Sequence, residues 1–241
     1  ISYKNIAHTN GMTFRLIEKG EHSVLKEALR INNQRWGIKS TFNEFKNRAK
    51  NGLFIGAFDA KGKLLGSVSA VLLKKGDVDK IGRKNHWAST WKGITGNGTL
   101  STNNPKGDSL VCVSVSTKPI KSKNRLLTPN TKKRLSTTDL QRYLESNLDT
   151  TITFHKKAKG GQNQGAKIVK VIEGGRPEDN EALGYNVLMQ YPTPKKLPKI
   201  SKSSTIGEQL IEAALYYSYQ KKLSYIYVYT RPSGLSRFFT R

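Results

Sequence analysis

The feature that most constrains the fold of this chain is an uninterrupted run of apolar and β-branched residues near its middle. Residues 110–115 read Leu-Val-Cys-Val-Ser-Val, inside a strand-like stretch that extends over residues 109–117. A strand without the usual alternation of polar and apolar positions is buried on both faces, as at the centre of a sheet covered by helices on both sides. The run therefore predicts an α/β domain with this strand at its centre.

Helix and strand patterns surround this central strand. Before it, the sequence predicts a strand at 12–19, helices at 21–36 and 41–51, and a hairpin of strands at 53–58 and 64–73. After it, the sequence predicts a helix that starts at residue 136 or 137, a further element at 151–157, strands at 166–172 and 185–191, a helix at 206–223 and a strand at 224–230. Such a series favours a central mixed, twisted sheet flanked by helices, of the α/β or α+β class.

A single domain is the expected organisation. A chain of 241 residues with 36% hydrophobic residues can bury a real core and has a size at which one elaborated domain is common. We expect one domain over residues 1–241, with a Trp- and Gly-rich excursion at 74–107 and basic linkers at 117–135 and 192–204. Trp36 is expected in the core. Trp87 and Trp91 are expected to pack the excursion, with stacking on a substrate as the alternative.

The charge balance indicates a polyanionic partner. The 42 Lys and Arg against 17 Asp and Glu give a formal net charge of +25, whereas solubility in a small domain needs only ~2 to 8. RNA is the obvious candidate, with solubility alone as the alternative, and no basic amphipathic helix indicates a membrane. Basic linker residues that either contact phosphates or belong to solvated spacers are Lys118, Lys121, Lys123, Arg125, Lys132, Lys133, Arg134, Lys195, Lys196, Lys199 and Lys202. No aromatic residue lies among them, which favours phosphate contact over base readout.

The single cysteine restricts the redox chemistry. Cys112 has no partner for an internal disulfide, no spacing of metal ligands is present, and no apolar run approaches the ~18 to 20 residues that cross a bilayer. We therefore expect an intracellular protein of the cytoplasm or an organelle matrix, with no metal. Because Cys112 lies mid-strand without an adjacent base, a buried structural thiol is favoured over a nucleophile.

The turn before the last helix has the residues of an anion site. It reads Lys202-Ser203-Ser204-Thr205-Ile206-Gly207 and opens a strongly amphipathic helix. Exposed N–H groups and the dipole at a helix start hold a pyrophosphate well. An ordinary helix start is the alternative interpretation, because a glycine near one is common.

Several stretches together resemble the GNAT superfamily of N-acetyltransferases. Residues 207–215, 226–229 and 231–235 are similar to the family's coenzyme-binding segment, whose helix opens with an Arg or Gln, two variable residues, Gly, one residue and Gly or Ala. Lys202 takes the first of these positions and Gly207 the last, whereas Thr205 stands where the middle glycine is usual. Stretches that resemble one bacterial branch of the family are 91–102, 107–113, 154–155, 165–169, 176–179 and 184–185. Together with the first predicted strand, the first two predicted helices and the hairpin, the resemblance extends over most of the chain.

The order of the segments differs from the order in the family. There, the strand that matches residues 109–117 runs directly into the coenzyme-binding helix, and the part that matches residues 154–191 comes last. Here that last part precedes the helix, between the two basic linkers. Linkers of this length can cross the surface of a sheet, since an extended residue spans ~3.3 Å. The resemblance therefore implies the acyl-CoA N-acyltransferase fold of the GNAT type with altered connectivity.

The activity that the resemblance implies is acetyl-CoA-dependent transfer of an acetyl group to a primary amine, by direct attack in a ternary complex. Backbone N–H groups at Val113, Ser114 and Val115 would receive the acetyl carbonyl where two parallel strands splay apart. His155 stands roughly where the family has a tyrosine acid, and its reference pKa of about 6.5 suits that role. An exposed histidine without a role is the alternative. Candidates for the base are Glu18, Glu21 and Glu27.

A non-catalytic relative is the rival interpretation. In it, the fold serves as an RNA-binding or assembly component of a ribonucleoprotein such as a ribosome-like particle. Thr205, the altered segment order and the net charge of +25 favour this rival, whereas the near-complete set of family segments favours the enzyme. An acetyltransferase that acts on RNA-bound or aminoacyl-tRNA substrates would use both features.

Overall fold

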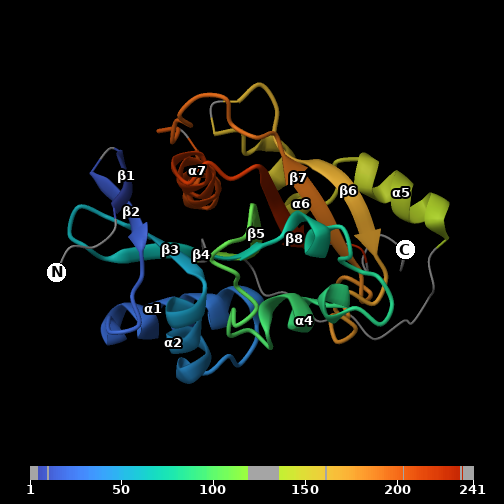
Figure 1. The fold of residues 1–241 in the computed structure, drawn as a ribbon, viewed down its shortest axis with the longest axis horizontal. Coiled ribbons are helices and arrows are strands. Elements are labelled where there is room, and N and C mark those ends of the chain that lie inside the picture. The colour runs from blue at the N-terminus through green and yellow to red at the C-terminus, as the bar shows by residue number, and fades with distance from the viewer. Residues whose placement is uncertain are drawn as a thin grey trace.

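A mixed sheet of eight strands, covered by helices on both faces, dominates the computed structural model, which describes residues 5–9, 11–118, 136–160, 162–202, 204–233 and 235 (Figure 1). The strand order is β1-β2-β3-β4-β5-β8-β7-β6. The strands are β1 Asn5–Thr9, β2 Met12–Leu16, β3 Leu53–Phe58, β4 Leu64–Leu73, β5 Ser109–Thr117, β6 Lys167–Ile172, β7 Asn186–Tyr191 and β8 Tyr225–Thr230. Neighbours are antiparallel except for β5 and β8, which run parallel. The predicted class, a mixed sheet flanked by helices, is confirmed.

The helices divide between the two faces of the sheet. They are α1 His22–Trp36, α2 Phe42–Asn51, α3 Lys75–Val78, α4 Trp91–Thr95, α5 Thr137–Glu145, α6 Thr150–Lys157 and α7 Ile206–Gln220, with a 3₁₀ turn, η1, at Trp87–Ser89. Leu110 and Cys112 of β5 pack in one core with α5, α6 and α7, whereas Val111 and Val113 pack in another with Ile94 of α4. A third core lies between α1, α2 and the strands β3 and β4, on the side away from α7 (Figure 1). The central strand is therefore buried on both faces, as its composition predicts.

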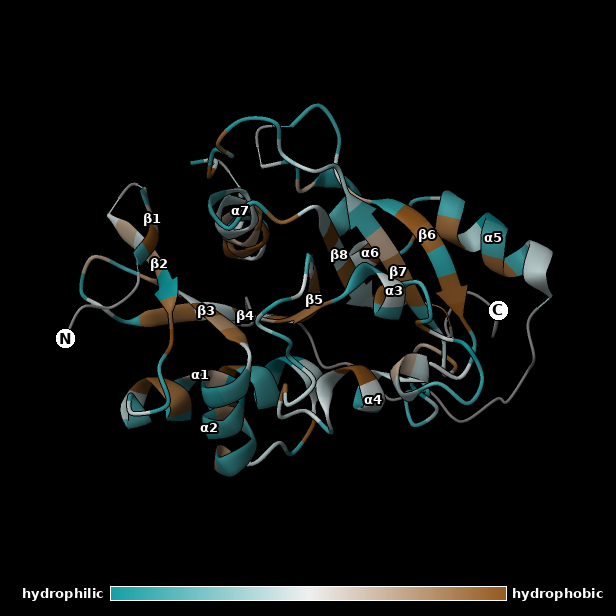
Figure 2. Ribbon diagram, viewed as in Figure 1, coloured by the Kyte–Doolittle hydropathy of each residue, from teal (hydrophilic) through white to brown (hydrophobic). Residues whose placement is uncertain are grey.

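Local signals in the sequence account for where the long helices begin. Thr41 caps α2 through a reciprocal pair of hydrogen bonds with Glu44, and Thr205 caps α7 in the same way with Glu208. Gly37 ends α1 in the left-handed conformation, with φ of 63°. The exposed helix α2 is mostly hydrophilic, whereas long stretches of β7 are hydrophobic (Figure 2).

Some elements differ from those predicted. The strand expected at 12–19 is the shorter β2, and β1 was missed because a five-residue edge strand with the sequence Asn-Ile-Ala-His-Thr carries little pattern. The expectation that Trp36 lies in the core is wrong, because this side chain is half-buried beside a cavity. Trp87 does not pack the excursion at 74–107 but is 43% exposed. Beyond Lys118, the first basic linker lies outside the described residues.

The order of elements along the chain differs from their order in space. Helices α5 and α6 and strands β6 and β7 come between β5 and α7 in the chain, yet β8 lies between β5 and β7 in the sheet. The last strand of the chain, β8, therefore lies inside the sheet, between two strands that precede it in sequence. That this order is a rearrangement of the family's own order stays a prediction.

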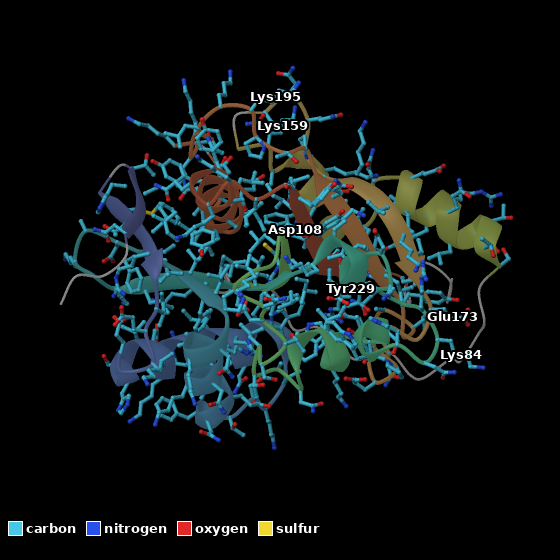
Figure 3. The ribbon with its side chains drawn as sticks, viewed as in Figure 1. Lys84, Asp108, Lys159, Glu173, Lys195 and Tyr229 are labelled. Atoms are coloured by element: carbon cyan, nitrogen blue, oxygen red, sulfur yellow. The ribbon has the colours of Figure 1, made fainter. Side chains whose placement is uncertain are left out.

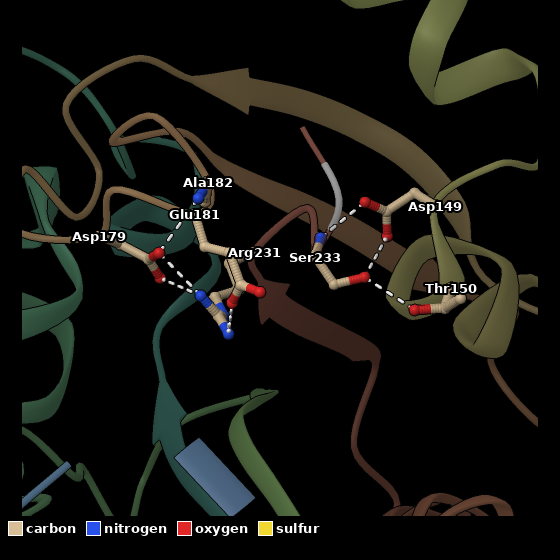
Figure 4. Close-up of polar contacts among 7 residues, drawn as sticks. All are labelled: Asp149, Thr150, Asp179, Glu181, Ala182, Arg231 and Ser233. Atoms are coloured by element: carbon tan, nitrogen blue, oxygen red, sulfur yellow. Dashed lines mark hydrogen bonds and ion pairs between the residues drawn. The ribbon is translucent and has the colours of Figure 1, made fainter. Parts of the chain in front are cut away.

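A buried carboxylate ties the end of β8 to the helices α5 and α6. Asp149 is 1% exposed, and its Oδ1 accepts hydrogen bonds from the N–H groups of Thr151 and Ile152, each at 2.9 Å. Its Oδ2 accepts from the Tyr143 hydroxyl at 2.8 Å. The same oxygen accepts from the N–H of Ser233 at 2.6 Å (Figure 4). One side chain therefore caps α6 and also anchors the segment that follows β8.

We expect Asp149→Ala to lower the free energy of unfolding by about 3 kcal/mol, because it removes a helix cap and the acceptor of two further buried hydrogen bonds. Urea unfolding followed by circular dichroism measures the change. Asp139→Ala, on the exposed first turn of α5, is the control and should cost less than about 1 kcal/mol. Equal losses in the two variants would contradict the anchoring role of Asp149.

Candidate functional site

The parallel strands β5 and β8 are hydrogen-bonded along only part of their length. Their pairing runs from Ser109↔Tyr225 to Cys112↔Val228 and stops there, although both strands continue. The ladder between β4 and β5 is irregular at the same place, where Ser69 pairs with Ser114 but Ala70 pairs with Cys112, so that Val113 is a bulge. A cavity of about 550 Å³ lies beyond the last pair, with residues of both strands in its walls.

The start of helix α7 lies at this same cavity. Thr205, Ile206 and Gly207 line it together with Val113, Ser114 and Val115, although these two groups are far apart in the chain. A single parallel pair that separates inside an otherwise antiparallel sheet, with a helix start beside the gap, is the arrangement that the sequence resemblance implies. In this respect the fold resembles that of GNAT proteins.

Comparisons with known proteins find only a low level of similarity. No protein-family model and no curated protein sequence matches the chain. Among solved structures, a GphF GNAT-like decarboxylase in complex with isobutyryl-CoA is 15% identical, with a TM-score of 0.41 over 72% of this chain and 95% of that one. The loading GNATL domain of CurA from Lyngbya majuscula is also 15% identical, with a TM-score of 0.44 over 76% of this chain and 98% of that one. A likeness of this degree carries no argument about ligand or chemistry.

The residues predicted to bind the coenzyme fall into three groups. Those that line the cavity are Val113, Ser114, Val115, Thr205, Ile206 and Gly207. Lys202 and Ser204 are described but do not line it, and Ser203 lies outside the described residues. The strand and the helix start are thus brought together, as predicted, while the outer part of the turn lies off the cavity.

A protein carboxylate already occupies part of the helix start. Glu208 Oε2 accepts hydrogen bonds from the N–H of Thr205 at 2.8 Å and from its hydroxyl at 2.9 Å. The N–H groups of Ile206 and Gly207 make no hydrogen bond to the part of the chain that is described. The ring of Phe154 lies against Gly207, since a Cβ at that glycine would be 3.2 Å from Phe154 Cε2. Two amides of the first turn are therefore left for an anion, next to a negative charge.

His155 lies in the wall of the cavity but is not exposed to solvent. It is 3% exposed, and its Nδ1 lies 2.9 Å from the hydroxyl of Tyr191 on β7. Burial lowers the pKa of His155 to about 3 and raises the pKa of Tyr191 well above 10. Both side chains are therefore neutral at physiological pH. The alternative of an exposed histidine, open in the sequence, is excluded.

Cationic side chains dominate the far wall of the cavity. The described residues that line it include Arg35, Arg48, Lys118, Arg176 and Arg231 but no Asp or Glu. We call Arg48, Arg176 and Arg231 the arginine wall.

Each guanidinium of the arginine wall lies over an aromatic ring. Arg48 lies over Phe45 of α2 at 4.4 Å, Arg176 over Trp91 of α4 at 4.6 Å, and Arg231 over Trp36 of α1 at 5.1 Å. These three rings belong to the helices on the face of the sheet opposite α7. Stacking on a ring fixes the plane of a guanidinium and leaves its edge for ligands.

The arginine wall is partly desolvated. Burial lowers the pKa of Arg48, which is 3% exposed, to about 10, and the positive charge of Arg176 acts in the same direction. Burial also lowers the pKa of Arg176, and the positive charge of Arg231 contributes to this shift. Three positive charges therefore lie close enough to repel one another in a medium that screens them poorly.

The arginine wall is only partly neutralised by carboxylates. Arg231 binds Asp179 through two hydrogen bonds of 2.7 and 2.9 Å and Glu181 through one of 2.7 Å (Figure 4). Arg48 Nε donates to the carbonyl of Gly98 at 2.7 Å, and neither Arg48 nor Arg176 has an ion pair within the described residues. Beside the wall, two buried polar atoms, Arg231 Nε and Asn186 Oδ1, make no hydrogen bond to the described residues. The guanidinium groups of Arg48 and Arg176 therefore lack a carboxylate partner there.

Sequence reasoning missed the arginine wall. Residues 176–179 and 231–235 were singled out only for their resemblance, with no role, and nothing around Arg48 distinguishes it from a surface arginine of an amphipathic helix. Trp91 lines the cavity and donates from Nε1 to the Val113 carbonyl at 3.1 Å, which suits the alternative in which it contacts a substrate. The signal that unites these residues is spatial.

Other candidates from the sequence lie away from the cavity. Glu21 pairs with Arg15 at 2.7 Å and Glu27 with Arg30 at 2.8 Å, and neither these two carboxylates nor Glu18 lines the cavity. Cys112 is buried, and burial raises its pKa to about 12, as expected of a structural thiol.

The predicted nucleic-acid residues are described only in part. Lys118 pairs with Glu27 at 3.3 Å, and Lys195, Lys196 and Lys199 are exposed. Those outside the described residues are Lys121, Lys123, Arg125, Lys132, Lys133 and Arg134.

Two searches of the described residues found nothing. No group of His, Cys, Asp and Glu side chains there could hold a metal ion, and no described helix has the length and apolar character to cross a membrane.

The buried neutral state of His155 predicts an acid-dependent loss of stability. Its pKa of about 3 in the fold lies below the value of about 6.5 in the unfolded chain, so the unfolded state binds the proton first. The contribution is complete above pH 6.5 and decreases by about 1.4 kcal/mol per pH unit as the pH falls towards 3. Urea unfolding at pH 7.5, 5.5 and 4.5 measures this decrease.

In His155→Gln the slope between pH 6.5 and 4.5 should be shallower, whereas His22→Gln, at an exposed position, should keep the wild-type slope. Parallel pH profiles for wild type and His155→Gln would contradict the buried neutral state.

Proposed function

We propose that the chain is an acyl-CoA-dependent N-acyltransferase that transfers an acetyl group from acetyl-CoA to a primary amine by direct attack in a ternary complex. The single observation that carries this proposal is the cavity where β5 separates from β8 beside the start of α7. A gap between two parallel strands offers backbone hydrogen-bond groups that are free of the ladder, next to a helix start that suits a phosphate. A thioester with a long arm and a pyrophosphate needs both.

The acyl end of the donor would lie against the bulged part of β5. Val113, Ser114 and Val115 are not paired with β8, so their backbone N–H groups are the proposed partners of the thioester carbonyl oxygen. Donors aimed at this oxygen stabilise the charge that develops on it during attack. Trp91 holds the carbonyl of Val113 in place and thereby sets the orientation of the bulge.

The reaction forms one bond and breaks another. The amine nitrogen bonds to the carbonyl carbon, the carbon–sulfur bond breaks, and the proton that the amine loses is taken up by the departing thiolate, directly or through water. Among the described residues, no carboxylate lines the cavity to act as a base. The arginine wall lowers the pKa of a nearby ammonium group, because it destabilises a further positive charge, and so raises the share of neutral, reactive amine.

His155 would act as a neutral hydrogen-bond donor rather than as a cationic acid. Because Tyr191 stays protonated, its hydroxyl can donate to His155 Nδ1, which leaves the proton of the imidazole on Nε2. That N–H is the proposed contact to the sulfur or the oxygen of the thioester. A positive imidazolium in the free protein is disfavoured by the pKa of about 3.

The phosphates would lie at the start of α7. The N–H groups of Ile206 and Gly207 are the proposed donors, and Lys202 is the nearest exposed cation of the turn in sequence. Glu208 opposes this binding through its charge, although it also caps the helix. The site is therefore expected to bind coenzyme A less tightly than a helix start without a carboxylate.

Because the charge of Glu208 opposes phosphate binding, its removal should strengthen the binding of acetyl-CoA. Glu208→Gln keeps the reciprocal cap, since Gln also suits this position, and removes the negative charge. We expect the Kd for acetyl-CoA, measured by calorimetry, to fall about 5-fold, equivalent to about 1 kcal/mol for one charge near a phosphate in a solvated site. The control Glu145→Gln, at the exposed end of α5, should leave Kd unchanged.

Two results would decide against the proposal. If the wild-type protein does not bind acetyl-CoA at millimolar concentration, the proposed enzymatic function is wrong. Binding that is identical in wild type and Glu208→Gln would place the phosphates elsewhere than at α7.

RNA binding is the second candidate function, as a non-catalytic component of a ribonucleoprotein. Exposed lysines gather where residues 192–202 pass the segment after α6: the N–H of Lys199 donates to the carbonyl of Gly160 at 3.2 Å, and Lys159 and Lys195 lie near each other (Figure 3). Of these, Lys159, Lys195, Lys196 and Lys199 have no ion pair within the described residues. With a net charge of +25, such a group favours contact with phosphates.

A salt series tests this second function. If Lys195, Lys196 and Lys199 each contact a phosphate of single-stranded RNA, their joint replacement by Gln should reduce the slope of log affinity against log salt by about 2. Replacement of Lys61 and Lys63 by Gln, in the exposed turn between β3 and β4, is the control. An unchanged slope in the triple variant would show that this group does not bind RNA.

A further inference from the structure

We infer that the acceptor amine carries a carboxylate, as a free amino acid does, and that the arginine wall binds this carboxylate on the side of the sheet opposite α7. The inference rests on the proposed function, because it names the acceptor for the same cavity. It concerns Arg48, Arg176 and Arg231, none of which the acyl donor is proposed to contact.

The position of the arginine wall assigns it to the acceptor. The donor is proposed to enter from the side of α7, with its phosphates at Ile206 and Gly207. The arginine wall stacks on rings of α1, α2 and α4, which pack on the other face of the sheet. The gap between β5 and β8 joins the two sides, since residues of both line one cavity. The acceptor amine must therefore pass the arginine wall to reach the thioester carbonyl of the donor.

The charge of this side excludes a simple cationic acceptor. An ammonium ion or a polyamine would enter a cavity whose described lining residues include five cations and no carboxylate, where like charges repel strongly because water is partly excluded. An anionic group has the opposite effect. It relieves the repulsion among the three guanidinium groups of the arginine wall, two of which, Arg48 and Arg176, have a pKa lowered by burial.

The geometry suits a carboxylate in particular. The planar fork of a guanidinium matches a carboxylate through two parallel hydrogen bonds, and stacking on an aromatic ring preorganises this fork. Arg176 and Arg48 have no ion pair within the described residues, so their N–H groups can bind a carboxylate of a ligand. Most of the N–H groups of Arg231 instead bind Asp179 and Glu181. Arg48 and Arg176 are therefore oriented by aromatic rings for binding a ligand, whereas Arg231 is held by carboxylates of the protein.

Two polar atoms without a hydrogen-bond partner among the described residues suit a ligand that has both an oxygen acceptor and an N–H donor. Arg231 Nε lacks an acceptor and Asn186 Oδ1 lacks a donor, and both side chains line the cavity. An amino acid provides a carboxylate next to an amine, so it offers both kinds of partner within one small molecule. A neutral amine or an amide offers no negative charge to the arginines.

Steady-state transfer from acetyl-CoA, followed by release of the free thiol, tests the inference. The acceptors are the common amino acids, each compared with its own C-terminal amide, and phosphoethanolamine and spermidine as a phosphate-bearing amine and a polyamine. We expect the best amino acid to exceed its amide in kcat/KM by at least about 10-fold, the size of one charged hydrogen bond.

Variants of the arginine wall should remove this preference. Arg176→Gln should lower kcat/KM for the amino acid about 10- to 100-fold, mainly through KM, and bring the ratio of amino acid to amide towards one. Arg176→Lys should recover part of the ratio, because the charge returns without the fork. The matched control is Arg142→Gln, at an exposed position of α5, which should keep the wild-type ratio.

The outcomes separate this inference from the proposed function. If acetyl-CoA does not bind, both fall together. If acetyl-CoA binds and is used with amides, spermidine or phosphoethanolamine at least as well as with amino acids, or with no acceptor tested, only the inference is overturned. It is also overturned if succinyl-CoA is strongly preferred over acetyl-CoA and Arg176→Gln abolishes that preference, because the carboxylate then belongs to the acyl chain.

Discussion

The end of the hydrogen bonding between β5 and β8 at Cys112 and Val228 is the constraint on which the rest of the site depends. Beyond this pair, backbone groups of two central strands lose their partners inside the molecule, which costs free energy unless other groups replace them. Part of the replacement comes from Trp91, which donates to the carbonyl of Val113. Beside it, Trp36 donates to the side-chain hydroxyl of Ser116 on β5 at 2.9 Å. The gap is therefore supported from α1 and α4, the same helices whose rings hold the arginines.

The site depends on which strands pair in space and not on the order of these strands along the chain. Helix α7 and strand β8 follow β6 and β7 in the chain, yet β8 pairs with both β5 and β7. We propose a single domain for this reason, because neither side of the sheet could separate without breaking the ladders of β8. Asp149 adds a second tie across the same region, from the helices after the first basic linker to the residues after β8.

Sequence patterns predicted the parts of this structure that depend on near neighbours. The hairpin of β3 and β4, the central strand and the start of α2 near Thr41 follow from periodicity and from neighbouring residues, whereas the cap at Thr205 was not predicted. The environment of His155 could not be predicted, because its burial is set by Tyr191 on a strand that follows much later. The arginine wall was missed for the same reason, as its members come from α2, the turn between β6 and β7, and the residue after β8.

The two ends of the cavity have opposite electrostatic characters, and this polarity restricts how a pair of substrates can bind. At α7, two backbone amides are the donors for an anion and Glu208 limits their strength, so the helix start favours a phosphate only modestly. At the other end, guanidinium groups on aromatic rings provide full charges with few counter-ions. An anionic acceptor and an acyl donor with phosphates would both gain from the arginines on charge alone. In the proposed arrangement the direction of binding therefore depends on the shape of the partners, because guanidinium forks suit a short planar anion such as a carboxylate.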